Sequence, residues 1–335
     1  MTRVLAARFD NDGDVLLTGP ALRAVAAGVD HLTLLCGPRG ARAAELLPGV
    51  DEIWVWRAPW IDPEPDPVDR ADVLGLERRL AAGDFDQALI FTSFHQSPLP
   101  LALLLRMAGV PTVAAISEDY PGSLLDVRHR VGDELHEVRR ALSLAATLGY
   151  GLPAGDDGRL RVLGGAEAPV LPAPYVVVHP GASVPARAWS AGRHAALVGA
   201  LAERGWSPVV TGAPSERGLT ARVAGADGID LGGETSLAEL GAVLAGAAAV
   251  VVANTGPAHL AAAVGTPVVS LFAPTVPWER WRPWAVECER LFVGVPCAGC
   301  RARECPVPGH PCLEGVEDED VLAAVERLAR VAVAA

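Results

Sequence analysis

The sequence predicts an α/β protein made of two doubly wound parallel-sheet domains in tandem. The length of 335 residues corresponds to two domains at roughly 150 residues each. With 50% hydrophobic and 20% charged residues, the chain can form packed cores and is unlike a disordered protein. Short apolar runs alternate with helical patterns in both halves, which is typical of parallel sheets. A ligand cleft is expected between the domains, at the carboxyl ends of the strands.

The first domain is expected to span residues 1–165. It contains five predicted strands: Val4–Ala7, His31–Cys36, Glu52–Trp56, Ala88–Phe91 and Thr112–Ile116. Helical patterns lie between them, at Leu16–Ala26, Asp72–Ala82 and Leu99–Ala108. The prolines and acidic residues of segment 62–69 indicate a surface loop.

A polar stretch rich in glycine and proline, residues 149–174, predicts a linker, after which the alternation restarts. The second domain is expected over residues 172–317, with strands at Tyr175–His179, Ser207–Thr211, Ala249–Ala253 and Val268–Phe272. Its helices are predicted at Arg193–Arg204, Glu216–Val223, Ser236–Ala245 and Ala258–Val264. A last helix in segment 318–335 is a candidate for packing back on the N-terminal domain.

The charge composition excludes several function classes. All 28 basic residues are arginine, so mechanisms that need a lysine are excluded: Schiff-base chemistry, pyridoxal phosphate anchoring and a Walker-type phosphate loop. The 40 acidic residues give a net charge of −12, which disfavours nucleic-acid binding. No signal-peptide pattern and no apolar run of ~20 residues is visible. We therefore expect a cytoplasmic protein without a transmembrane segment.

Three aspartates, Asp10, Asp12 and Asp14, follow the first strand. No G-x-G-x-x-G pattern is present there, and an acidic loop repels phosphate. The loop suits a general base or a hydrogen-bond acceptor for a hydroxylated substrate, and Gly13 permits a tight turn before Asp14. The alternative is that Asp12 or Asp14 caps the following helix.

The strand ends of the second half have the opposite character. Asn254, Thr255, Gly256, Pro257 and His259 open a helix directly after an apolar strand, and a helix N-terminus of this kind binds anions such as a diphosphate. The alternative is a Gly–Pro turn with a capping threonine and an incidental histidine.

Two further strand ends carry candidate donor-binding residues. His179 and Gly181 end one strand, and Arg187 in the next loop is a candidate phosphate clamp. Gly212 ends the following strand, and Glu216 is a candidate acceptor of ribose hydroxyls. Arg187 and Glu216 are alternatively solvated surface residues.

Other polar positions are less specific. His95 and Glu118 follow the fourth and fifth strands, and are either acceptor-binding or ordinary loop residues. Cys297, Cys300, Cys305 and Cys312 form a C-x2-C-x4-C-x6-C pattern. Structural zinc on these cysteines is an alternative, but plain thiols are favoured, and no metal site is predicted.

The motifs and their order resemble glycosyltransferase family 9, the heptosyltransferase family with the GT-B fold. They are R-x-D-x-x-G-D-V-L-L-T-x-P-A-L-R at residues 8–23, H-P-G-A at 179–182, R-x-W at 187–189, T-G-P-x-H at 255–259 and G-T-P-V-V-S-L-F at 265–272. The resemblance covers most of the chain and is strongest over residues 3–23 and 175–284. It implies two Rossmann-like domains, of which the first binds the acceptor and the second the donor.

The resemblance also implies roles for single residues. Asp14 matches the general base of an inverting transferase that uses ADP-heptose, and Arg187 matches a basic residue, often lysine, that holds the donor phosphate. Glu216 matches the carboxylate near the ribose. Asn254 stands where members often carry aspartate, which leaves the donor sugar open.

The remaining matches are Thr255, Gly256, Pro257 and His259, at the diphosphate-binding turn. No cofactor or metal is implied.

The expected partners are a nucleotide-sugar donor and a glycan, glycolipid or small-molecule acceptor, with peripheral membrane contact if the acceptor is lipid-linked. Lipopolysaccharide biosynthesis is the implied process. The alternatives are a nucleotide-sugar 2-epimerase of the same fold and a non-catalytic nucleotide-sugar-binding protein.

Overall fold

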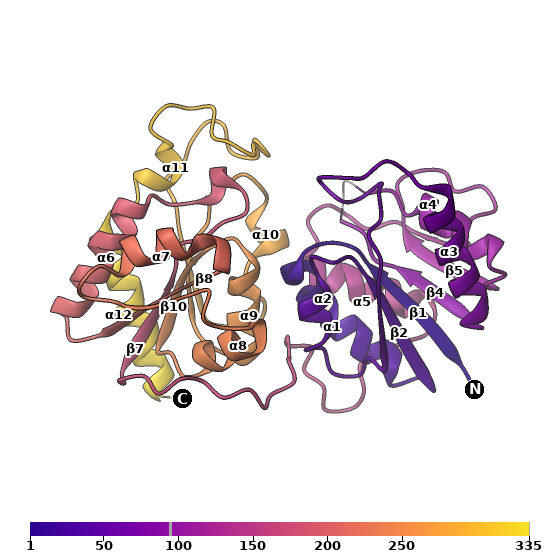
Figure 1. Cartoon of the computed structure of the whole chain (residues 1–335), viewed down its shortest axis with the longest axis horizontal. Helices are drawn as coiled ribbons and strands as arrows, with labels where there is room; N and C mark the ends of the chain where they lie inside the picture. Colours follow the sequence, from indigo (N-terminus) through magenta and orange to yellow (C-terminus); the bar gives the residue numbers. More distant parts are fainter. Residues whose placement is uncertain (94–95, 335) are drawn as a thin grey trace. The chain divides into compact units, whose positions relative to one another are not determined.

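The chain folds into two compact units, residues 1–163 and 164–335, each built on one six-stranded parallel sheet (Figure 1). The computed structural model describes residues 1–93 and 96–334. Helices cover both faces of each sheet, so the predicted α/β fold class with two doubly wound parallel sheets is confirmed.

The sheet of the first unit has the strand order β3-β2-β1-β4-β5-β6, and all its pairs are parallel. Its strands are β1 (Arg3–Arg8), β2 (His31–Cys36), β3 (Glu52–Val55), β4 (Gln87–Ile90), β5 (Thr112–Ile116) and β6 (Val127–His129). The order reverses between β1 and β4. The loops that follow these two strands therefore diverge to opposite faces and leave a crevice at their carboxyl ends.

Two groups of helices cover this sheet. They are α1 (Asp12–Ala26), α2 (Ala41–Ala44), α3 (Arg70–Ala82), α4 (Leu99–Met107) and α5 (Glu137–Thr147). Helices α3 and α4 bury leucines against one face. Helix α1 packs against α5 and α2 on the other.

The second unit repeats this topology, with the order β12-β11-β10-β7-β8-β9. Its strands are β7 (Tyr175–His179), β8 (Ser207–Gly212), β9 (Ile229–Gly232), β10 (Ala249–Ala253), β11 (Val268–Leu271) and β12 (Cys288–Leu291). Its helices are α6 (Ala191–Glu203), α7 (Arg217–Ala224), α8 (Leu237–Ala245), α9 (Gly256–Val264), α10 (Trp278–Trp281), α11 (Pro311–Glu314) and α12 (Asp318–Ala334), with short 3₁₀ turns η1 (Pro185–Arg187) and η2 (Pro214–Glu216).

The two central strands of this sheet, β7 and β10, each contain three consecutive valines. Val176–Val178 and Val250–Val252 are fully buried, because helices lie on both faces. A strand that is covered on both faces therefore has consecutive apolar residues, rather than alternating apolar and polar ones.

Helix α12 belongs to the core of the second unit. Val321, Leu322 and Val325 are buried in that core, and Arg204 pairs with Glu319 and Glu326 on the exposed side. Helix α12 packs against α6 and the strands β10, β11 and β12 of its own unit. Its expected contact with the first domain stays a prediction.

Sequence reasoning missed the edge strands β6, β9 and β12. Their sequences, VRH, IDLG and CERL, mix polar with apolar residues because they are only partly covered. It also missed α5, which contributes the charged side chains Glu137 and Arg140 to the cluster around Arg8.

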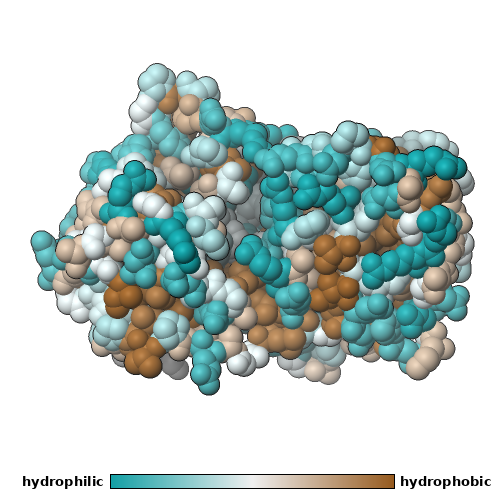
Figure 2. All heavy atoms as spheres, in the orientation of Figure 1, coloured by the Kyte–Doolittle hydropathy of each residue, from teal (hydrophilic) through white to brown (hydrophobic). Residues whose placement is uncertain are grey.

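No helix within residues 1–93 and 96–334 is long and apolar enough to cross a membrane. Hydrophilic residues cover much of the face seen in Figure 2, with apolar patches interspersed between them.

A buried ion pair holds the segment around Asp156, near the end of the first unit, against helix α1. The Arg23 guanidinium donates to both carboxylate oxygens of Asp156 at 2.7 and 2.9 Å, and to the Arg159 carbonyl at 2.8 Å. Hydrogen bonding to Arg23 lowers the pKa of Asp156 to about 2.

Because the folded-state pKa of Asp156 is depressed, its stabilisation is present above about pH 4 and is lost as pH falls towards 2. We expect Asp156→Asn to reduce the unfolding free energy at pH 7 by about 1–2 kcal/mol. Thermal melts at several pH values should show the difference from the unmodified protein shrinking between pH 4 and pH 2. Asp157→Asn, the exposed neighbour, is the control, and a loss as large in this control would contradict the assignment.

Candidate functional site

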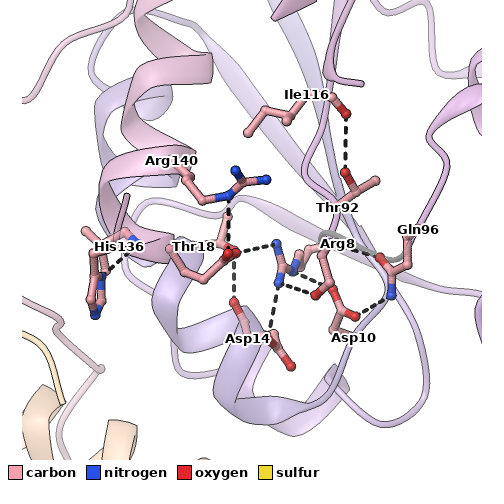
Figure 3. Close-up of polar contacts among 12 residues, drawn as sticks. Arg8, Asp10, Asp14, Thr18, Thr92, Gln96, Ile116, His136 and Arg140 are labelled. Carbon is pink, nitrogen blue, oxygen red and sulfur yellow. Dashed lines mark hydrogen bonds and ion pairs between the residues drawn. The ribbon is translucent and has the colours of Figure 1, made fainter. Parts of the chain in front are cut away.

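A buried arginine, Arg8, organises the polar residues at the end of β1 (Figure 3). Its side chain is 4% exposed, and its Nε lies 2.7 Å from Oδ2 of Asp10. Its Nη2 lies 3.2 Å from Oδ1 of Asp14 and donates to the Ser93 hydroxyl at 3.1 Å. Its Nη1 lies 3.8 Å from Oε2 of Glu137. One guanidinium thus joins β1, α1, α5 and the loop after β4.

Helix α1 begins at Asp12, earlier than the sequence predicted. Asn11 in extended conformation precedes it, with no side-chain capping bond, so Gly13 and Asp14 lie in the first helical turn rather than in a loop. Neither Asp12 nor Asp14 is the N-cap. Acidic residues in a first turn are stabilised by the helix dipole.

Asp14 is the most exposed carboxylate of this cluster. Its side chain is 18% exposed, against 9% for Asp10 and 3% for Glu137. Its backbone carbonyl accepts from the Thr18 hydroxyl at 2.9 Å within the helix. Of these three carboxylates, Asp14 is therefore the one most accessible to a ligand.

Asp10 and Asp12 both have partners within the first unit, and their expected acceptor-binding role stays a prediction. Asp10 pairs with Arg8 and accepts from the Gln96 amide. Asp12 accepts from Arg42 at 2.7 Å and from the backbone N–H of Ala43 at 3.2 Å, which fixes α2. Burial raises the pKa of Asp12, while Arg42 opposes this shift.

Two residues of this cluster, Glu137 and Arg140, were not predicted. They lie in the first turns of α5, are 3% and 5% exposed, and pair with each other at 3.2 Å. A charged pair that far from β1 in the sequence gives no local signal, since only the fold brings α5 beside α1.

A cavity of about 60 Å³ opens beside Asp10, at the carboxyl ends of β1, β2 and β3. Arg39 and Arg57 line it, and each lies within 3.7 Å of the buried Asp62 carboxylate. Of the other expected acceptor residues, Glu118 has an exposed side chain, with its carbonyl bonded to Arg128. His95 lies outside the described residues.

In the second unit, the adjacent strands β10, β7 and β8 end at the predicted donor-binding residues. Glu216 lies over two glycines: a Cβ on Gly181 would overlap its carboxylate, and a Cβ on Gly212 would come 3.2 Å from its Oε2. The same carboxylate accepts from the backbone N–H of Ala213 at 2.8 Å. Gly181 therefore leaves room for the Glu216 carboxylate, whereas a Cβ on Gly212 would be blocked first by Thr220, at 2.6 Å from its Cγ2.

Asn254 ends β10 with a buried and unsatisfied amide. It is 8% exposed, and among the described residues neither its Nδ2 nor its Oδ1 has a hydrogen-bond partner. An unsatisfied buried polar group costs about 1–3 kcal/mol, so this amide calls for an external partner. It immediately precedes the N-terminus of α9.

Helix α9 begins at Gly256, with Pro257 in its first turn and Thr255 as the N-cap residue. The Thr255 side chain makes no capping hydrogen bond, so the capping alternative is not what the structure shows. His259, in the first turn, is buried. This helix end is a suitable anion site, because the dipole and the first N–H groups favour negative charge.

His179 is the last residue of β7, and Arg187 lies in the loop that follows this strand. The His179 ring hydrogen-bonds the Thr211 hydroxyl at 2.9 Å, and burial lowers its pKa to about 4, so it is neutral at pH 7. Arg187 is half-buried and ends η1, in the loop that follows β7.

The four-cysteine segment lines one small cavity together with His310. No three histidine, cysteine, aspartate or glutamate side chains in the described ranges are arranged to hold a metal ion. His310 contacts the Ala186 carbonyl at 3.2 Å, and Ala186 donates to the Arg303 carbonyl at 2.9 Å. The segment thus braces the turn that carries Arg187.

Comparisons with known proteins place the chain in a family. A family model described as glycosyltransferase family 9 (heptosyltransferase) matches residues 73–310. The chain is 33% identical to lipopolysaccharide heptosyltransferase 1 of Pseudomonas aeruginosa, over 69% of this chain and 66% of that protein. It is 32% identical to lipopolysaccharide heptosyltransferase 3 of Escherichia coli, over 46% of each. The chain thus spans about half the length of the Escherichia coli relative.

Solved structures of low sequence identity share the fold. A family 9 glycosyl transferase from Veillonella parvula superposes with a TM-score of 0.80 at 18% identity, over 98% of this chain and 97% of that one. Escherichia coli heptosyltransferase WaaC with ADP-2-deoxy-2-fluoro heptose gives 0.74 at 22% identity, over 97% and 99%. Since the family model spans more than half of the sequence, the chain belongs to glycosyltransferase family 9.

Proposed function

We propose that this protein is an inverting glycosyltransferase that transfers a heptose, or a related hexose-type sugar, from an ADP-activated donor to a hydroxylated acceptor. The buried, unsatisfied amide of Asn254 beside the α9 N-terminus carries the proposal. This site supplies hydrogen bonds for a sugar and a positive helix end for a diphosphate in adjacent positions. The relative solved with an ADP-heptose analogue supports ADP-heptose as the donor.

The second unit would hold the donor. Glu216 at the β7 and β8 ends would accept from ribose hydroxyls, Arg187 and the start of α9 would bind the diphosphate, and Asn254 would bind the sugar. As the glycosidic bond breaks, negative charge develops on the departing diphosphate. A fixed guanidinium and a helix N-terminus stabilise that charge more in the transition state than in the ground state.

The first unit would supply the base. Asp14 accepts the proton of the acceptor hydroxyl while that oxygen attacks the anomeric carbon, and the bond to the diphosphate breaks in the same displacement. One displacement inverts the anomeric configuration. ADP leaves with the bonding electron pair, so the proton and charge balance without a further reactant.

The cavity beside Asp10 is our candidate acceptor subsite. Its two arginines, Arg39 and Arg57, share the buried Asp62, and each has a second carboxylate partner, Glu64 and Asp66 respectively, so its positive charge is compensated. This favours an acceptor that is recognised through hydroxyl groups over one that carries several phosphates. A glycan, a glycolipid headgroup or a polyhydroxylated small molecule fits this description.

A transfer assay distinguishes this proposal from the epimerase alternative. ADP-heptose is incubated with the protein, with and without a panel of hydroxylated acceptors. ADP release and the anomeric configuration of the product are followed by NMR. We expect release of ADP that depends on the acceptor, with an inverted product. A free sugar epimer formed without any acceptor would instead identify an epimerase.

Asn254→Ala should separate binding from stability. Removing an unsatisfied buried amide is expected to leave the melting temperature unchanged or raised. The affinity for the sugar-bearing donor should fall by about 10- to 100-fold, because each lost hydrogen bond is worth about 1–2 kcal/mol. Calorimetry with ADP and with ADP-heptose checks this. ADP alone should bind unchanged, and an equal loss for both would contradict the assignment to the sugar.

A further inference from the structure

We propose that Arg8 is a positioning residue for the reaction: its guanidinium, held by Asp10 and Glu137, fixes the Asp14 carboxylate and keeps it ionised. This inference rests on the function proposed above, because it concerns the base of that reaction. It adds a residue that has no part in the substrate-binding roles assigned so far.

The geometry gives each part of the guanidinium a separate partner. Nε faces Asp10 at 2.7 Å, Nη1 faces Glu137 at 3.8 Å and Nη2 faces Asp14 at 3.2 Å. Figure 3 shows Arg8 between Asp10 and Asp14. Asp10 lies in the loop after β1 and Glu137 lies in α5. These two contacts hold the guanidinium from two sides and so fix the position from which it contacts Asp14.

Burial makes this contact strong. Burial lowers the pKa of Arg8, but Asp10, Asp14 and Glu137 together raise it above its ordinary value, so the cation is retained. A guanidinium at hydrogen-bond distance favours the ionised form of a carboxylate. The contact with Arg8 thus favours the carboxylate form of Asp14, which is the form that can accept a proton.

Other charged groups lie on the elements that pack against α1. They are Arg42 on α2 and Glu45 at its C-terminal end, Arg3 on β1 and His31 on β2, and His136, Glu137, Arg139 and Arg140 at the start of α5. Arg42 pairs with Asp12. Arg140 pairs with Glu137 and is as buried as Arg8, at 5% against 4% exposure. Arg140 is therefore the matched control, because it is a buried arginine of the same cluster that pairs with Glu137.

The test is the titration of Asp14 itself, followed by carboxyl ¹³C NMR in the full-length protein, with the signal assigned through Asp14→Asn. In Arg8→Gln the midpoint of Asp14 is expected to rise by about one pH unit or more, because the neighbouring cation is lost. Arg140→Gln should lower the melting temperature and leave the midpoint in place. An unmoved midpoint in Arg8→Gln, or an equal shift in Arg140→Gln, overturns the inference.

Turnover gives a second readout. In Arg8→Gln the acidic limb of kcat/KM should move to higher pH together with the NMR midpoint, with the KM for the donor unchanged. Arg8→Lys keeps the positive charge but loses the planar guanidinium that contacts three carboxylates. We therefore expect the pH at which kcat/KM falls on the acidic side to stay the same, while kcat falls by about 10- to 100-fold. If Arg8→Gln does not fold, Arg8→Lys decides the matter: a full kcat, or a loss expressed in the donor KM, overturns the positioning role.

The NMR readout needs no substrate. A protein that fails to turn over ADP-sugars refutes the proposed function, while the Asp14 titration still tests Arg8.

Discussion

Asp14→Asn is expected to lower kcat by about 10²- to 10⁴-fold while the affinity for ADP stays unchanged. The amide has the shape of the carboxylate but cannot take up the proton of the acceptor hydroxyl. The residues that we propose bind the donor all belong to the second unit, so we expect their geometry to be unaffected. Steady-state kinetics and calorimetry with ADP measure the two effects.

Asp12→Asn provides the control for Asp14, since both aspartates lie in the first turn of α1. Asp12 bonds Arg42 and the backbone of α2. Its substitution should lower the melting temperature and change kcat by no more than a few-fold. If Asp14→Asn retains normal turnover, Asp14 is not the base. If Asp14→Asn loses ADP binding as well, its effect is structural.

Arg187→Ala is expected to lower kcat by about 10²- to 10³-fold, because its guanidinium would balance the charge that develops on the departing diphosphate. Arg187→Lys should recover much of that loss, since a point charge remains although the planar fork does not. EDTA should leave the rate unchanged, because the proposed stabilisation comes from the arginine and the α9 N-terminus.

Arg193→Ala is the matched control for Arg187. Arg193 lies in α6 and pairs with Glu317 and Asp318, which ties α6 to the start of α12. This variant should lose stability and keep kcat. Equal activity losses in both variants would show that the Arg187 effect is a consequence of unfolding. A normal kcat in Arg187→Ala would remove Arg187 from the diphosphate site.

Periodicity and turn residues predicted most of the fold. The ranges of β2, β5, β7 and β10 agree with the sequence prediction residue for residue, because strands buried on both faces are unbroken apolar runs bounded by polar turns. The edge strands β6, β9 and β12 failed this criterion because they are only partly covered, whereas β3, which also lies at an edge, was predicted. The start of α1 was placed too late, because Gly13 suggested a turn where the helix has already begun.

The candidate site divides in the same way. Strand ends and motif spacing led to Asp14, Glu216 and the α9 start, all of which are local signals. The partners of Asp14 are not local: Arg8 closes a buried strand and Glu137 opens a distant helix. Their pairing depends on the contact between α1 and α5, which no pattern within either segment encodes. The unsatisfied amide of Asn254 likewise became visible only with its burial.

The central claim is that this family 9 protein takes its sugar from an ADP-activated donor. Isothermal titration of the full-length protein with ADP-, GDP-, UDP- and dTDP-sugars tests it most directly. We expect ADP-heptose to bind most tightly, with affinity reduced in Asn254→Ala and retained in Asp14→Asn. Binding of a GDP-, UDP- or dTDP-sugar in preference, with no binding of any ADP compound, would contradict the claim and leave the fold assignment intact.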